Sequence, residues 1–322
     1  MNETSKISDT SKGYLIIISA VFCWSFSEVI VKLLQGAVGP LTLSFFRFFI
    51  GGIFLLIILL IKRDLEGIFK MFKENVLLFL IASCFAFGLS NVIYFIGVNF
   101  TQANFAATIY TTYPIWITIY SYFILKERSN MKLKFIGIII GILGVILLMT
   151  NFNFLELFSS EYFIGNLLVL LGSIIWSLYS VFGKKIQMKE EDTSNIAIKF
   201  TMLSSFFAAV PVFLILIFTP ELNTFFQYDV TSWFWIIFLG IISTGLGIYL
   251  LYEGIRWVEL SKGISLAFLK PIFATILAFL ILNELPTFAL IVSIILVIVS
   301  ILLINRNPNK EKITNNSGKY DK

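Results

Sequence analysis

The segment PIWITIYSYFILKE, residues 114–127, recurs 157 positions later as PIFATILAFLILNE, residues 271–284, with seven of its fourteen positions identical. A second pair of segments, CWSFSEVIVK (residues 23–32) and IWSLYSVFGK (residues 175–184), shares Trp, Ser, Val and Lys at an offset of 152. An apolar composition produces chance matches of Leu and Ile, but it does not align Trp, Pro and Glu in one register. We therefore interpret the chain as two copies of one unit.

The composition is that of a membrane protein. Hydrophobic residues make up 58% of the chain and charged residues 13%, and the mean hydropathy is +0.92. A soluble domain carries roughly 25% charged residues. The chain has no His, and its two cysteines, Cys23 and Cys84, lie within apolar runs. The sequence therefore predicts neither a metal site nor a disulfide framework.

Hydrophobic runs long enough to cross a bilayer, which takes about 20 residues, occur ten times. The predicted spans are 13–32, 40–61, 75–98, 104–125, 134–151, 162–183, 195–218, 232–255, 261–282 and 286–304. Each copy of the unit holds five spans, and because five is odd, the second copy enters the membrane upside down. The sequence thus predicts an all-α integral membrane protein with ten transmembrane helices in two inverted five-helix repeats.

Basic residues divide the connecting segments into two classes. Twenty of the 24 Lys and Arg residues fall in the tails and in the loops on one side, and the loops on the other side hold none. Because cytoplasmic loops collect Lys and Arg, both termini of this multi-pass protein of the cell membrane are expected in the cytoplasm. The net charge of +5 needs no nucleic-acid partner. The predicted order is a cytoplasmic tail (1–12), the first repeat (13–151), an extracytoplasmic linker (152–161), the second repeat (162–304) and a cytoplasmic tail (305–322).

Several motifs carry a family resemblance. The stretch 243–284, Trp24, the Arg47-Phe48 pair and the Pro-to-Glu ends of spans four and nine resemble the EamA branch of the drug/metabolite transporter (DMT) superfamily. The resemblance covers the chain apart from its tails. It implies a carrier without cofactors, monomeric or homodimeric, whose central cavity is lined by spans one, three, four, six, eight and nine and opens alternately to either side.

Polar and aromatic residues inside the spans are the candidate substrate-binding residues, because an ionisable residue at membrane depth marks a functional site by default. Lys270 lies about 13 Å into span nine at a rise of about 1.5 Å per residue. We predict that Lys270 binds a carboxylate or phosphate, with Tyr113 opposite as a hydrogen-bonding partner. Trp24 and Trp176 either pack against the substrate or pack in the core. A fixed ion pair between Lys270 and Glu28 is the competing interpretation. The further candidates are Asn91, Tyr94, Tyr110 and Tyr249.

The candidates for gating or coupling are Glu28, Lys32, Arg47, Lys199 and Glu253. Glu28 and Lys32 stand four residues apart and can pair on one helix face, which favours a structural or outward-gate role over proton transport. Lys32 and Lys199, near span ends, could instead snorkel to the interface. Glu253 could form an interfacial ion pair with Arg256, one turn away.

Pro114 and Pro271 are predicted helix breaks. A proline leaves one carbonyl of the preceding turn without its helical partner, which a membrane protein tolerates only where protein or water supplies another donor. The residues before the prolines, Tyr113 and Lys270, are therefore expected beside a polar cavity.

The sequence favours secondary-active transport over other classes of function. An enzyme is not expected, because the chain has no His, no acidic pair inside a span and no Gly-rich phosphate loop. A channel would fit ten spans, but inverted repeats with bulky central groups favour an occluding carrier. The predicted function is alternating-access export of a small organic metabolite, an amino acid or another carboxylate-bearing compound. The alternative is an organic-phosphate or nucleotide-sugar-like exchanger.

Overall fold

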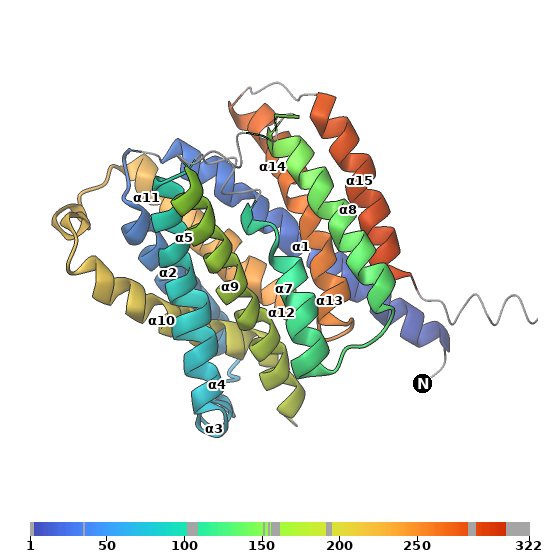
Figure 1. The fold of residues 1–322 in the computed structure, drawn as a ribbon. Coiled ribbons are helices and arrows are strands. Elements are labelled where there is room, and N and C mark those ends of the chain that lie inside the picture. The colour runs from blue at the N-terminus through green and yellow to red at the C-terminus, as the bar shows by residue number, and fades with distance from the viewer. Residues whose placement is uncertain are drawn as a thin grey trace, which may run out of the picture.

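The computed structural model describes residues 3–34, 36–101, 109–150, 152–153, 155, 162–190, 195–282 and 288–306. These ranges are almost entirely helical, and no strand occurs within them. Most of the predicted linker 152–161 and the predicted tail beyond residue 306 lie outside the described residues. The helices pack side by side in one bundle (Figure 1).

The first repeat begins with a helix longer than predicted. α1 (Glu3–Leu33) starts within the predicted tail 1–12, because extending an existing helix costs far less than starting one. The remaining elements are α2 (Pro40–Ile61), α3 (Ile68–Glu74), α4 (Val76–Leu80), the π-helical segment η1 (Ile81–Leu89), α5 (Ser90–Asn99), α7 (Tyr113–Tyr120), the π-helical segment η2 (Ser121–Leu125) and α8 (Met131–Thr150).

The second repeat follows the same order. Its elements are α9 (Phe163–Lys189), α10 (Ile196–Leu216), the 3₁₀ turn η5 (Pro220–Thr224), α11 (Val230–Phe238), the π-helical segment η6 (Leu239–Leu246), α12 (Gly247–Gly254), α13 (Leu260–Gly263), the 3₁₀ segment η7 (Ile264–Phe268), α14 (Leu269–Leu282) and α15 (Phe288–Asn305). Short helices joined end to end, such as α11, η6 and α12, together make one membrane-crossing run.

Eight helical runs within the described residues are long and apolar enough to cross a membrane. They correspond to predicted spans one to three and six to ten. The fourth predicted span is described only as the shorter run Tyr113–Leu125, since residues 102–108 lie outside the described ranges. The fifth is α8, whose 20 residues reach about 30 Å. The all-helical architecture is confirmed, and the count of ten stays a prediction.

The π-helical segments η1 and η6 occupy matching positions in the two repeats. Each contains the repeated Gly-Leu pair, at Gly88 and at Gly245, and each packs against the second helix of the other repeat. A Cβ at Gly88 would lie 2.7 Å from the Ala208 carbonyl oxygen on α10, and one at Gly245 would lie 3.2 Å from the Gly51 carbonyl oxygen on α2. The two repeats are therefore interleaved rather than stacked as separate halves.

Gly88→Ala is expected to destabilise the folded protein by about 1–3 kcal/mol, because the new methyl group would push α10 away from η1. Thermal unfolding of the detergent-purified variant measures the effect. Gly172→Ala is the matched control, since its Cβ would come no closer than 3.2 Å to a neighbouring atom. Equal unfolding temperatures for the two variants would contradict the tight contact between η1 and α10.

The pair α8 and α15 forms the last layer of the bundle (Figure 1). The pattern Gly137-xxx-Gly141 on α8 predicts close packing of a neighbouring helix or dimerisation. A Cβ at Gly137 would lie 2.9 Å from the Ser300 carbonyl oxygen, and one at Gly141 would lie 2.6 Å from the Ser300 hydroxyl oxygen. The packing interpretation is confirmed, because α15 of the same chain fills this surface.

The basic loops all gather at one end of the bundle. We call this the basic end; it comprises residues 62–75, 126–134, 184–190, 253–262 and 305–306. Hydrogen bonds join these segments to one another and to the start of α10. At the opposite end, Glu221 after α10 accepts a hydrogen bond from the backbone N–H of Thr42 at 2.9 Å. The sequence predicts that loops with basic residues alternate with loops that have none. In the structure, the described basic loops accordingly lie together at one end.

Candidate functional site

The repeat-related tryptophans meet at the centre of the bundle. The rings of Trp24 on α1 and Trp176 on α9 lie 6.2 Å apart with their planes at 81°, an edge-to-face contact between the two repeats. Each residue is less than 10% exposed. The Trp24 ring also lies against Gly247, where a Cβ would come within 2.8 Å of it. In this conformation the pair forms part of the core.

Three tyrosines of the first repeat extend this centre. Tyr113 contacts the ring of Trp176 at 4.8 Å, Tyr110 lies 6.3 Å from it, and Tyr94 packs on Tyr110 at 4.6 Å. The structure thus brings together five of the predicted substrate-binding residues, from α1, α5, α7, α9 and the residues just before α7. A cluster of this kind offers aromatic faces and phenol hydroxyls to one small ligand.

Serine hydroxyls satisfy the carbonyls around the proline breaks. The carbonyl freed by Pro114 is that of Tyr110, four residues earlier, and it accepts a hydrogen bond from Ser173 Oγ at 3.0 Å. The next serine on α9, Ser177, shares its single hydroxyl proton between the Ser173 carbonyl at 2.8 Å and the Tyr113 carbonyl at 3.2 Å. Pro114 stands in the first turn of α7, directly after the turn at 111–112, and α9 supplies a donor to the carbonyl four residues before it.

The same bond recurs in the second repeat. Ser25 on α1 is the counterpart of Ser177, and Lys270 is the counterpart of Tyr113. The single proton of Ser25 Oγ is shared between the Val21 carbonyl at 2.8 Å and the Lys270 carbonyl at 3.2 Å. Pro271 follows the 3₁₀ segment η7, so the helix is also irregular here. The Lys270 side chain is half-buried. Two symmetric bonds therefore fix the backbone of Tyr113 and Lys270 beside the opposite repeat's first helix.

Asn91 and Tyr249 are the two remaining candidate substrate-binding residues. Asn91 Nδ2 donates to the Phe87 carbonyl at 2.7 Å, in the stretch where the π-helical η1 gives way to α5. Tyr249 packs beside Leu55 and Met202, residues of α2 and α10. The structure therefore places Asn91 at a π-helical irregularity, a feature frequent at functional sites, and Tyr249 between this apolar cluster and the central one that holds Trp24 and Trp176.

Arg47 lies in the half of the bundle away from the basic end. Its Nε donates to Thr244 Oγ1 at 3.3 Å and its Nη2 to Ser27 Oγ at 3.4 Å. The hydroxyls of Ser27 and Ser243 lie 2.5 Å apart. A guanidinium and three hydroxyls therefore converge from α1, α2 and η6. Glu28 and Lys32 belong to α1, but their side chains lie outside the described residues.

The other two predicted gating residues form ion pairs at the basic end. Lys199 Nζ lies 2.6 Å from Asp64 Oδ1, and its side chain is 5% exposed, so this lysine is paired rather than snorkelling. Arg256 Nη1 lies 2.9 Å from Glu253 Oε2. The predicted pairing of Glu253 with Arg256 is confirmed.

Two tyrosines absent from the predicted site close the bundle between the tryptophans and the basic end. Tyr179 and Tyr252 are fully buried, and the Tyr252 hydroxyl donates to the Tyr179 carbonyl at 2.9 Å. Phe87 stacks on Tyr179 at 4.4 Å. The repeat counterparts of Tyr179 and Phe87 are Ser27 and Thr244, which hold Arg47 in the other half. At each of these two equivalent positions, one repeat carries an aromatic ring and the other a hydroxyl. This difference between the repeats was the available sequence signal.

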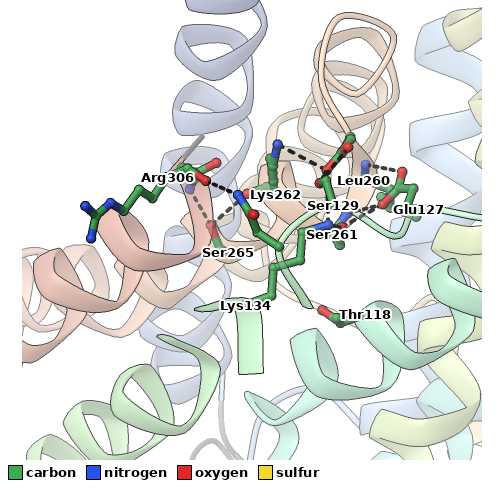
Figure 2. A network of polar contacts seen from close by, with 12 residues as sticks. Thr118, Glu127, Ser129, Lys134, Leu260, Ser261, Lys262, Ser265 and Arg306 are labelled. Carbon is green, nitrogen blue, oxygen red and sulfur yellow. Dashed lines mark hydrogen bonds and ion pairs between the residues drawn. The ribbon is translucent and has the colours of Figure 1, made fainter. Parts of the chain in front are cut away.

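A polar network, shown in Figure 2, seals the basic end. The carboxylate of Glu127 accepts hydrogen bonds from the backbone N–H of Leu260 at 2.7 Å and from the N–H and Oγ of Ser261 at 3.0 and 2.7 Å. It thereby caps the start of α13, where free N–H groups favour an anion. The end of the fourth span is thus bound to the start of the ninth.

Glu259 provides the second junction of this network. Its carboxylate accepts from Ser129 Oγ at 2.7 Å and from Lys134 Nζ at 3.0 Å, and Lys262 Nζ lies 3.3 Å away. Lys134 is 0% exposed and also donates to Ser261 Oγ at 2.8 Å. Burial opposes ionisation of Glu259, but these donors and charges outweigh it and hold the pKa of the carboxyl below its ordinary value.

The Glu259 network is expected to weaken in acid. Because the folded-state pKa of Glu259 lies below 4.5, its contribution to stability is present above pH 4.5 and is lost as the pH falls through the folded-state pKa. Glu259→Gln should therefore unfold at a lower temperature than the wild type at pH 7, and the difference should shrink below pH 4.5. Thermal unfolding across this range is the measurement, with the exposed Glu66→Gln as control. A difference independent of pH would contradict the assignment.

The comparisons with known proteins agree with this two-fold organisation. The profile of the EamA-like transporter family matches residues 11–150 and, separately, residues 163–306. An uncharacterized transporter of Clostridium kluyveri is 27% identical over 304 residues, covering 93% of this chain and 94% of its own. The uncharacterized transporter YoaV of Bacillus subtilis is 26% identical over 302 residues, covering 91% and 96%.

A solved structure, titled "Crystal structure of protein", shares the fold. Its TM-score is 0.73 at 20% sequence identity, and the match covers 92% of this chain and 96% of that one. The two profile matches coincide with the two sets of helices that interleave through η1 and η6. The chain therefore belongs to the EamA-like transporter family, with one copy of the family's unit in each repeat.

Proposed function

We propose that this protein is a secondary-active, alternating-access exporter of a small organic metabolite that carries a carboxylate, such as an amino acid. The observation that carries the proposal is the pair of symmetric bonds from Ser25 to the Lys270 carbonyl and from Ser177 to the Tyr113 carbonyl. They place the backbone of Tyr113 and Lys270 against the helices that carry the tryptophans, and the Tyr113 ring contacts Trp176 at 4.8 Å. Paired helix irregularities at a repeat interface suit a carrier's binding site.

The chemistry of these residues sets the substrate class. Lys270 offers an ammonium to a carboxylate, and the rings of Tyr113, Trp24 and Trp176 offer apolar faces to the rest of a small molecule. Rearrangement of the close Trp24–Trp176 contact would make room for the ligand. Lys270 and the aromatic rings then bind one molecule between the repeats.

The polar network and the buried tyrosines support a conformation closed at the basic end. In the alternating-access cycle, the bonds of Glu127 and Glu259 break when that end opens, and the smaller hydroxyl residues around Arg47 line the route to the opposite side. The repeats rock about the central aromatic cluster. This arrangement favours a carrier over a channel, because opening one end depends on closing the other.

An organic-phosphate exchanger is the second candidate. The observation that favours it is a second cation, Arg47, held by Ser27 and Thr244 in the half of the bundle opposite the basic end. A guanidinium and an ammonium on one route suit a doubly charged phosphate as well as a carboxylate.

An untargeted metabolite comparison tests the proposal. Cells that overproduce the protein should accumulate a carboxylate-bearing metabolite in the medium relative to empty-vector cells, and proteoliposomes loaded with that compound should show saturable transport. Strict one-for-one exchange of phosphate esters would favour the second candidate. Single-channel currents without saturation would contradict both.

The orientation of the chain is tested with reporters fused after Lys322. Because the described loops rich in Lys and Arg gather at one end, that end is expected to face the cytoplasm. A reporter active only in the cytoplasm should work, and one active only after export should stay silent. The reverse pair of signals would overturn this orientation and the direction of transport drawn from it.

A further inference from the structure

A pocket lies at the basic end, apart from the centre formed by Trp24 and Trp176. Its volume is about 310 Å³, and it lies between the last turns of α9, the start of α10 and the turn that follows α12. Lys184, Gln187 and Glu190 line it from α9, and Arg256 and Trp257 line it from the turn. Lys184, Glu190 and Arg256 make the contacts described above for the basic end, whereas Gln187 makes none among the described residues.

Gln187 is the unusual residue in this pocket. Its side chain is 6% exposed, and neither its Nε2 nor its Oε1 has a hydrogen-bond partner among the described residues. A buried amide without partners is costly, and proteins rarely retain one without a ligand or water to satisfy it. Gln187 lines the pocket, and because both amide atoms are themselves buried, a rotation of the side chain is what brings the amide to a ligand.

Two cations lie beside this amide. Lys184 Nζ donates to the carbonyl of Ile255, which uses one of its three N–H groups. Arg256 pairs with Glu253 through Nη1 alone, and within the described parts of the chain no other bond of its guanidinium occurs. Spare donors therefore come from α9 and from the facing turn.

One acid also lines the pocket. The carboxylate of Glu190 is engaged by Asn75, whose Nδ2 donates to it at 3.2 Å. The donors that remain in the pocket outnumber the acceptors, so an oxygen-rich anion satisfies more groups than a cation would. Trp257 adds an amphipathic ring of the kind enriched at membrane interfaces.

We propose that this pocket is a phosphate-binding site in which Gln187 Nε2, Lys184 and Arg256 donate to the phosphate oxygens. The site is separate from the central substrate site and independent of the transported compound. Three donors from two directions match a tetrahedral oxyanion better than a planar carboxylate. The phosphate can belong to a soluble molecule or to the headgroup of an anionic lipid, which share this chemistry.

Two binding measurements on the full-length protein distinguish these sources. In the first, inorganic phosphate is titrated into detergent-purified protein at constant ionic strength, with thermal unfolding and tryptophan fluorescence as readouts. In the second, the protein is placed in nanodiscs of phosphatidylcholine with or without phosphatidylglycerol, and retained lipid is identified by native mass spectrometry. Saturable stabilisation by inorganic phosphate indicates a soluble ligand, and selective retention of phosphatidylglycerol alone indicates a lipid.

Gln187→Leu is the decisive variant. The leucine side chain has a similar volume but no unpaired amide. Without ligand, the variant should therefore fold, and its unfolding temperature should equal or exceed that of the wild type. The wild type is expected to bind either inorganic phosphate or phosphatidylglycerol. The affinity of Gln187→Leu for that probe should fall at least about tenfold, as should that of Arg256→Met. Gln227→Leu, an exposed glutamine at the opposite end, is the matched control and should bind like the wild type.

Three results would overturn the proposal. They are binding of neither probe by the wild type, unchanged binding by Gln187→Leu, and a marked loss of stability in ligand-free Gln187→Leu, which would assign the amide a structural partner.

Discussion

Replacement of Lys270 by alanine is expected to abolish transport of the anionic substrate while leaving the protein folded and inserted. The carbonyl of Lys270, not its side chain, makes the bond to Ser25 that fixes the backbone here, and that bond survives the substitution. Loss of one partner from a desolvated charge pair costs about 2–5 kcal/mol, which corresponds to a loss of affinity of about 30-fold or more.

Transport and binding in proteoliposomes, with the metabolite identified by the screen, measure this effect. Lys270→Arg should restore transport only in part, because the planar guanidinium differs in shape from an ammonium. Lys132→Ala, at an exposed lysine near the start of α8, is the matched control.

The competing interpretation is an ion pair between Lys270 and Glu28. It predicts that Lys270→Ala fails to fold and that Glu28→Gln in the same chain rescues it. Normal transport by Lys270→Ala would reject the substrate-binding role altogether.

Glu127→Gln is expected to open the basic end. The substitution keeps the shape of the side chain but removes the charge that accepts three hydrogen bonds from Leu260 and Ser261. Hydrogen bonds to charged groups are worth about 1.5–3 kcal/mol, so the population of the open conformation should rise at least about tenfold.

Cysteine labelling from the basic side measures this opening. In a chain with Cys23 and Cys84 replaced by alanine, Ala267→Cys places one thiol at a fully buried position in η7. A membrane-impermeant thiol reagent should label it slowly when Glu127 is present and faster with Glu127→Gln.

Glu221→Gln is the matched control for this experiment. Glu221 accepts from the N–H and Oγ1 of Thr42 and so has the same chemistry at the opposite end of the bundle. Its substitution should leave labelling of Ala267→Cys unchanged. Equal acceleration by both variants would show general loosening of the bundle and contradict the assignment of Glu127 to the basic end.

The sequence identified the residues of the centre through the repeat. Trp24 and Trp176 share a register, as do Tyr113 and Lys270, and the structure brings each pair to the interface between the copies. This succeeds because an inverted duplication must place equivalent positions about one axis, so residues near that axis meet their own counterparts. The prolines added a second constraint, since a freed carbonyl within the bilayer requires a donor from a neighbouring helix.

The side-chain partners were decided only by the tertiary structure. Lys199 near its span end was compatible with snorkelling until the packing of α2 on α10 brought Asp64 within 2.6 Å. Likewise, Glu127 is recognisable as a repeated position, but its role as the cap of α13 depends on the approach of the fourth span to the ninth.

Composition, hydrophobic runs and the internal repeat by themselves determined that this protein is a helical membrane protein built from two inverted copies. The physical reason is that the bilayer demands helices of a fixed length, so the information is local in the chain. Only the tertiary structure decided which contacts join the helices towards the basic end, namely the stacking of Phe87 on Tyr179 and the bonds of Glu127 and Glu259. Those contacts join residues more than 90 positions apart, and their formation depends on distances that no local pattern specifies.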